Sequence, residues 1–135
     1  MLEYKKDYIE RMTEEMVYFL GKLMGMVNAG NNEEALSYMQ QRSNDVYPID
    51  YTALNGMSTD GILTLIKENN FNKKVVEMIA DLQLLEAQLM EKSTGNVQRK
   101  PLERARGLFM YLEVASGEYS FERQFKIEEI NLKLL

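Results

Sequence analysis

The spacing of apolar residues over positions 5–30 constrains the fold of this chain more than any other feature. These residues follow one another at steps of one, three or four positions: Tyr8, Ile9, Met12, Met16, Phe19, Leu20, Leu23, Met24 and Val27. This spacing puts side chains on one face of an α-helix and fits no strand pattern. A lone amphipathic helix is marginally stable in water, so this helix, on the order of 40 Å long, needs later segments to cover its apolar face.

The same periodicity and several capping residues predict further helices along the chain. Gly30 is the expected left-handed end of the first helix, and Pro101 is expected at a first helical position. The expected N-caps are Asp50, either Ser58 or Thr59, and Ser120. The predicted segments are a hairpin over 4–42, an irregular loop over 43–57 with one helical turn at 50–56, helices over 58–69 and 71–92, and a C-terminal hairpin over 101–134.

These segments predict a single helical domain over residues 1–135. The length is that of one domain, and only two prolines interrupt the chain. The expected fold class is all-α, with about six helices arranged as antiparallel hairpins, because the connection after the first helix is too short for any other arrangement. The hairpins form either a short repeat array or an irregular helical bundle.

Several apolar or small residues allow two interpretations. The loop at 43–57 contains Tyr47 and Tyr51, which either cover the core or present an apolar contact surface; the core is the favoured interpretation. Gly21 and Gly25 share one helix face and favour tight internal packing over contact with another chain. The methionines fit core positions, namely Met12, Met16, Met24 and Met78, better than a peptide-binding groove.

The last helix, over 120–134, has no single apolar face, so it is either buried on two sides or packed on another protomer.

The two inter-helix turns resemble those of the tetratricopeptide repeat, a helical hairpin that stacks into a solenoid. Gly30, Asn31 and Ala35 fit its turn pattern, and Gly117, Glu118 and Tyr119 fit part of it, with Glu122 in place of the usual small residue. The opening segment, over 4–12 and 19–23, resembles a family of short, functionally uncharacterised bacterial proteins with such hairpins. The first resemblance implies a partner-binding scaffold, and the second implies no activity.

The composition excludes several kinds of chemistry. The chain has no Cys and no His, so it offers no disulfide, thiolate nucleophile, zinc–sulfur site or Ser-His-Asp triad. No phosphate-binding or dinucleotide-binding loop is present, and Glu14, Glu15, Glu128 and Glu129 are interpreted as solvated charge rather than a carboxylate site. We therefore expect no catalytic residue, no cofactor and no metal.

Charge is unevenly distributed. Net charge is −5, yet residues 92–135 carry eight basic residues against six acidic ones. A basic cluster at 92–106 could bind an anion or an acidic partner, although no aromatics interleave with it as single-stranded nucleic acids would require. Its members are Lys92, Arg99, Lys100, Arg104 and Arg106.

Together these features predict a non-catalytic protein–protein interaction or scaffold module in the cytoplasm of a bacterium. The partner is a protein or peptide, including a second copy of this chain; nucleic acid is disfavoured, and no membrane segment is visible. The alternatives are a homo-oligomeric structural protein, an anion- or nucleic-acid-binding regulator that uses the basic cluster, and a carrier with a ligand cavity between hairpins. The candidate partner-binding residues are Tyr47, Tyr51, Arg99, Lys100, Arg104 and Arg106.

Overall fold

The structure is a computed structural model that describes the backbone of residues 2–135 and the side chains of residues 7–135. Within that range the chain forms helices and no strand, which confirms the predicted all-α class. None of these helices combines the length and the apolar character that crossing a membrane requires. The helices are α1 (Leu2–Asn28), α2 (Asn32–Val46), α3 (Tyr51–Leu54), α4 (Thr59–Glu68), α5 (Lys73–Thr94), α6 (Arg99–Ser116) and α7 (Phe121–Lys133).

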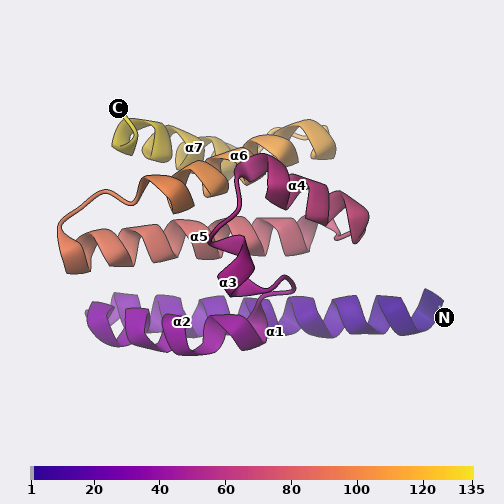
Figure 1. Cartoon of the computed structure of the whole chain (residues 1–135), viewed down its shortest axis with the longest axis horizontal. Coiled ribbons are helices and arrows are strands. Elements are labelled where there is room, and N and C mark those ends of the chain that lie inside the picture. The colour runs from indigo at the N-terminus through magenta and orange to yellow at the C-terminus, as the bar shows by residue number, and fades with distance from the viewer. Residues whose placement is uncertain (1) are drawn as a thin grey trace.

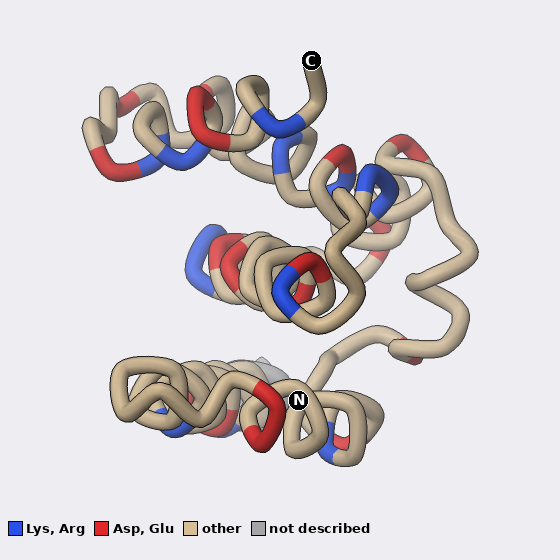
Figure 2. The backbone as a smooth tube through the Cα atoms, turned by 90° about the vertical axis from the view of Figure 1, so that its left-hand side faces the viewer, with Lys and Arg blue, Asp and Glu red and all other residues tan. Residues whose placement is uncertain are grey.

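The helices stack in layers around α5. Figure 1 shows α1 and α2 side by side in the lowest layer, with α5 above them and α6 on the opposite side of α5. Helix α7 packs on α6 at the top of the molecule, and α4 lies beside α6 (Figure 1). Seen from the side, α5 occupies the middle of the stack (Figure 2). A tetratricopeptide-like relation between the hairpins stays a prediction.

Helix α5 is the most deeply buried element. The sequence predicts one apolar face for it, but the structure buries residues around most of its circumference, because helices cover it from two sides. The buried residues are Val75, Val76, Met78, Ile79, Ala80, Leu82, Gln83, Leu84, Leu85, Ala87 and Leu89.

The predicted capping residues begin and end most helices as expected. The Ser58 hydroxyl accepts a hydrogen bond from the Gly61 amide at 3.2 Å, and the Ser120 hydroxyl accepts one from the Arg123 amide at 3.2 Å. Asp50 caps the single turn of α3 through the Thr52 amide. Gly30 adopts φ of +83° after α1, a left-handed conformation that favours glycine.

Two predicted boundaries were wrong. Helix α2 continues to Val46 instead of ending by Arg42, because its last turn carries the buried Ser43 and the half-buried Val46, which pack inward. Helix α6 begins at Arg99, so Pro101 lies at its third position rather than its first. Proline is tolerated there because the amides of the first turn have no partner within the helix.

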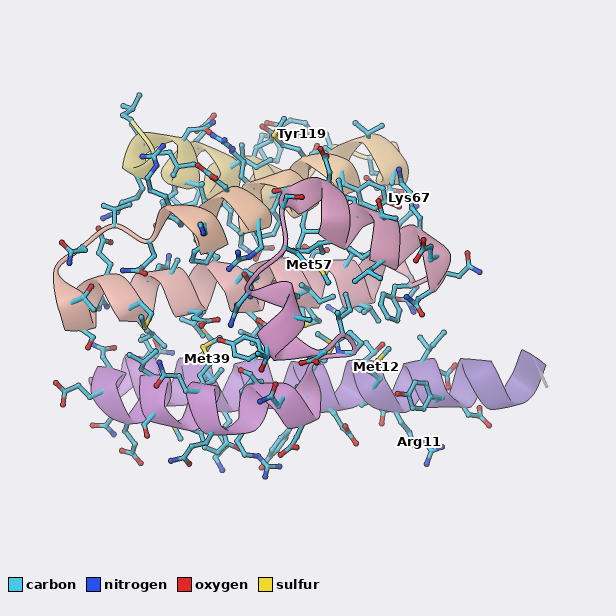
Figure 3. All side chains as sticks on the ribbon, in the orientation of Figure 1. Arg11, Met12, Met39, Met57, Lys67 and Tyr119 are labelled. Carbon is cyan, nitrogen blue, oxygen red and sulfur yellow. The ribbon has the colours of Figure 1, made fainter. Side chains whose placement is uncertain are left out.

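The core contains most of the residues that the periodicity assigns to it. Met12, Met16 and Met78 are buried, but Met24 is 42% exposed and its assignment to the core was wrong. Tyr8 is also exposed, since only the C-terminal part of α1 lies beside α2 (Figure 1). Met39 of α2 points between the lowest layer and α5 (Figure 3), where it is fully buried.

Internal packing does not explain Gly21 and Gly25, contrary to the favoured interpretation. A Cβ atom added at either glycine would meet no atom within 4 Å, because both lie on the outer side of α1. Gly107 in α6 is different: a Cβ there would overlap Cγ2 of Thr59 in α4. The close approach of α4 to α6 therefore depends on Gly107 and not on the glycines of α1.

We predict that Gly21→Ala and Gly25→Ala each raise the free energy of unfolding by about 0.5–1 kcal/mol, because alanine has the higher helix propensity and open space receives its methyl group. Gly107→Ala is the matched control and should lower that free energy by about 1–3 kcal/mol through its overlap with Thr59. Urea denaturation followed by circular dichroism measures all three variants. Destabilisation by the two α1 substitutions would contradict the exposed position of this helix face.

Candidate functional site

Tyr47 and Tyr51 lie inside the protein rather than on a contact surface. They are 6% and 7% exposed, and their rings pack with centroids 5.0 Å apart and planes tilted by 52°. Leu54, in the next turn of the same segment, is completely buried. The loop therefore covers the core, as the favoured interpretation predicts, and its tyrosines present no apolar surface to a partner.

Tyr47 begins a buried chain of hydrogen bonds that reaches α6. The Gln83 side-chain amide donates to the Tyr47 hydroxyl at 3.1 Å, and Arg104 Nε donates to Gln83 Oε1 at 2.8 Å. Gln83 is 0% exposed and Arg104 only 5%, and a second Arg104 nitrogen donates to the Asn55 carbonyl at 3.4 Å. Buried polar groups of this kind must be paired, so the chain ties the 47–55 segment to α5 and α6.

A second contact lies beside the first. The Tyr51 hydroxyl donates a hydrogen bond to Glu86 Oε1 in α5, while Glu86 Oε2 is buried with no protein partner. Burial raises the pKa of Glu86 above its usual 4.5, an effect opposed by the Tyr51 hydrogen bond and the charge of Arg104. Burial likewise lowers the pKa of Arg104, which the charge of Glu86 opposes.

Two clefts adjoin this polar cluster, which consists of Tyr47, Tyr51, Gln83, Glu86 and Arg104. One, of about 390 Å³, lies between α5 and the start of α6, and the other, of about 500 Å³, lies between the α3–α4 connection and α6. Both are lined by Asn55, Lys100 and Arg104. Glu86 lines only the first of these clefts, and its Oε2 atom is buried beneath the surface of that cleft.

The structure separates the predicted basic cluster. Arg104 is buried in the polar cluster, whereas Arg106 donates to the Asn131 side chain in α7 at 2.9 Å. Arg99 donates to the Leu134 carbonyl at 3.2 Å and lies 3.9 Å from the Glu103 carboxylate. Lys92 belongs to the last turn of α5 and lines a different cleft. Only Arg99, Lys100 and Arg104 line one cleft together, so these basic residues form no continuous basic surface.

The acidic residues do not assemble into a metal site among the side chains of residues 7–135. Glu14 and Glu15 are exposed on α1, and Glu128 and Glu129 are exposed on α7. Their sequence interpretation as solvated charge agrees with this exposure.

Sequence reasoning missed Gln83 and Glu86, the two residues that connect the tyrosines to Arg104. Gln83 lies between Leu82 and Leu84 and one helical turn after Ile79, and a polar residue at such a position was the signal available. Its partners could not be inferred, because Tyr47 and Arg104 lie 36 and 21 residues away in the chain.

Comparisons of the chain with protein-family models, with curated proteins and with solved structures find no match.

We predict that Glu86→Gln removes a destabilising contribution that grows as the pH rises. The folded-state pKa of Glu86 is raised, so the folded protein holds this proton more tightly than the unfolded chain does. The protonated Glu86 side chain therefore makes its full contribution to the free energy of unfolding below about pH 4.5. This contribution is lost as the pH rises through the folded-state pKa and the carboxyl group ionises. Relative to the unsubstituted protein, Glu86→Gln should gain stability across that window in urea titrations at a series of pH values.

Glu113→Gln provides a control of opposite sign. The hydrogen bond from Arg123 lowers the pKa of Glu113, so this group stabilises the fold above about pH 4.5 and ceases to do so as the pH falls. The two variants should therefore deviate from the unsubstituted protein in opposite directions. A flat difference for Glu86→Gln would contradict the burial of its carboxylate.

Proposed function

We propose that this chain is a non-catalytic protein-binding module of the bacterial cytoplasm and that its α6–α7 hairpin is the binding surface. One observation carries the proposal: seven of the twelve exposed large apolar side chains between residues 7 and 135 belong to residues 110–135. Exposed apolar groups that gather in one region are typical of interaction sites. The seven are Met110, Val114, Tyr119, Phe121, Phe125, Leu132 and Leu135.

The aromatic part of this surface lies at the α6–α7 turn. Tyr119 and Phe121 pack edge to face with ring centroids 4.9 Å apart, although they are 66% and 81% exposed. Tyr119 lies at the top of the molecule, on the far side from α1 and α2 (Figure 3). Exposed aromatic side chains are favourable anchors for a protein partner because each can bury a large area on binding.

The other classes of function have less support. An anion- or nucleic-acid-binding role needs a continuous basic surface, whereas Arg99, Arg104 and Arg106 contact protein oxygens. A homo-oligomeric role remains the alternative, since the same hairpin could meet its own copy. The cytoplasmic assignment rests on the absence of cysteine, which suits a reducing compartment.

The test is site-specific photo-crosslinking. A photo-reactive phenylalanine analogue placed at position 125 should form adducts with a partner protein in native lysate, because Phe125 is 68% exposed. The matched control carries the analogue at position 18, where Tyr18 is 71% exposed on α1, and should form few or none.

Three outcomes separate the functions. A discrete adduct specific to position 125 supports a protein-binding module, and an adduct of twice the chain mass supports the homo-oligomer. Equal labelling from positions 18 and 125, or turnover in a screen of hydrolase and transferase substrates, would overturn the proposal.

A further inference from the structure

Helix α7 turns its basic residues toward the protein. Arg123 is 8% exposed, and its Nε lies 2.8 Å from the Glu113 carboxylate in α6. Lys126 Nζ lies 2.7 Å from the Asp81 carboxylate, and Lys133 Nζ lies 2.8 Å from that of Glu91. Both of these carboxylates belong to α5, and each Lys or Arg of α7 is thus paired with an acidic residue of another helix.

The pairing is firm at the first two positions. Arg123 also lies 3.7 Å from the Glu77 carboxylate and donates to the Ser116 hydroxyl and the Glu118 carbonyl. Burial alone would lower the pKa of Lys126, but the hydrogen bond and charge of Asp81 outweigh it and raise that pKa above its usual value. Removing a cation from such a pair would leave a poorly solvated carboxylate, so these cations are not free to meet a partner.

The opposite side of α7 is apolar and acidic. Phe121, Phe125, Glu128 and Leu132 follow one another at steps of four, three and four residues, so they form one stripe, here named the α7 outer face. All four are exposed, the three apolar ones by 81%, 68% and 71% in chain order. Of the two sequence interpretations of this helix, burial on two sides is therefore wrong, because only the side of Ile127 and Ile130 is buried. Packing of its tail on another protomer stays a prediction.

Further carboxylates lie along one side of the α7 outer face and just before its N-terminal end. Glu118, Glu122 and Glu129 are exposed like Glu128. Among the side chains of residues 7–135, Glu122 is the one of these four carboxylates that forms an ion pair, with Lys126 at 3.4 Å, and that lysine also contacts Asp81. The face therefore combines an apolar stripe with uncompensated negative charge, and its four-three-four spacing is that of a seam against which another helix packs.

A second copy of α7 does not complement this face. In a parallel pair Glu128 would face Glu128 of the other copy, and like charges at a seam repel. In an antiparallel pair that places Phe121 opposite Leu132, Glu128 would face Phe125. Neither arrangement offers a free cation to Glu128, because Arg123, Lys126 and Lys133 are each paired with a carboxylate of α5 or α6.

We propose that the α7 outer face binds a basic amphipathic helix of another protein. The apolar side chains of that helix cover Phe121, Phe125 and Leu132, and a Lys or Arg within its apolar seam pairs with Glu128. This inference rests on the proposed protein-binding function and names the chemistry of the partner. Nucleic acid or an anionic membrane is a poor ligand here, since the nearby carboxylates repel phosphate.

The probe is a fluorescein-labelled synthetic helix of about 18 residues, with Leu at its seam positions, one central seam Lys, and Lys or Arg at the flanking positions. Two further peptides serve for comparison: one replaces the seam Lys by Glu, and the other has the same composition in scrambled order. Fluorescence anisotropy measures binding to the full chain. We expect the seam-Lys peptide to bind at least about tenfold more tightly than either comparison peptide, and its affinity to fall as salt is raised.

Protein variants assign the binding to α7. Phe125→Ser should weaken binding of the seam-Lys peptide by about tenfold or more. Tyr18 is equally exposed on α1, so the matched control Tyr18→Ser should leave the affinity for this peptide unchanged. The Glu128→Lys variant should no longer bind the seam-Lys peptide and should bind the seam-Glu peptide instead. Glu14→Lys, an exposed charge reversal on α1, is the control for net charge. All four positions are exposed, and circular dichroism checks that each variant is folded.

The outcomes separate this inference from the proposed function. If the seam-Lys peptide does not bind, or binds Glu128→Lys and the unsubstituted protein alike, the basic-helix inference is overturned. The protein-binding function survives that result if crosslinking at position 125 still yields a partner. If position 125 yields no specific partner and Phe125→Ser leaves peptide binding unchanged, both fail.

Discussion

Every layer of this protein depends on the burial of α5 from two sides. Its apolar residues surround most of the helix, and they meet α1 and α2 in one direction and α6 in the other. Burying a large aliphatic side chain stabilises a fold by about 1.5–3 kcal/mol, so this one helix accounts for much of the favourable free energy of folding. Hairpins α1–α2 and α6–α7 touch each other mainly through α5 (Figure 1). A polar residue within α5 must therefore find a buried partner, and Gln83 does so between Tyr47 and Arg104.

The polar cluster follows from the path of the chain between α2 and α4. That path crosses from the lowest layer to the upper one past the side of α5, where α3 lies (Figure 1). The backbone hydrogen bonds of this segment join residues of the segment and the end of α2 only, so side chains attach it to α5 and α6: Tyr51 to Glu86, and Arg104 to the Asn55 carbonyl. The fold tolerates the buried guanidinium of Arg104 because neighbouring elements supply its hydrogen-bond acceptors. The negative charge of Glu86 also partly offsets the effect of burial on Arg104.

The sequence predicted what local physics decides and missed what tertiary contact decides. Helix positions followed from periodicity and from caps such as Ser58 and Ser120, whose hydrogen bonds span only three residues. Tyr47, Tyr51 and Arg104 were singled out for separate reasons, and their meeting through Gln83 and Glu86 had no local signal. The sequence also could not predict that Gly21 and Gly25 are exposed. A small residue on a helix face indicates close packing only where another helix lies against that face, and none does here. Likewise the mixed pattern of α7 did not reveal which of its faces would be buried.

The orientation of α7 is decided by charge rather than by apolar area. Turning this helix over would cover Phe121 and Phe125 but would expose Ile127 and Ile130, so the buried apolar area would change little. It would also carry Arg123, Lys126 and Lys133 into solvent and leave Glu77, Asp81 and Glu113 partly buried without cations. Leaving these carboxylates without their cations would be unfavourable, so the ion pairs favour the observed orientation of α7. The aromatic side chains are thus held in solvent by contacts on the far side of their own helix.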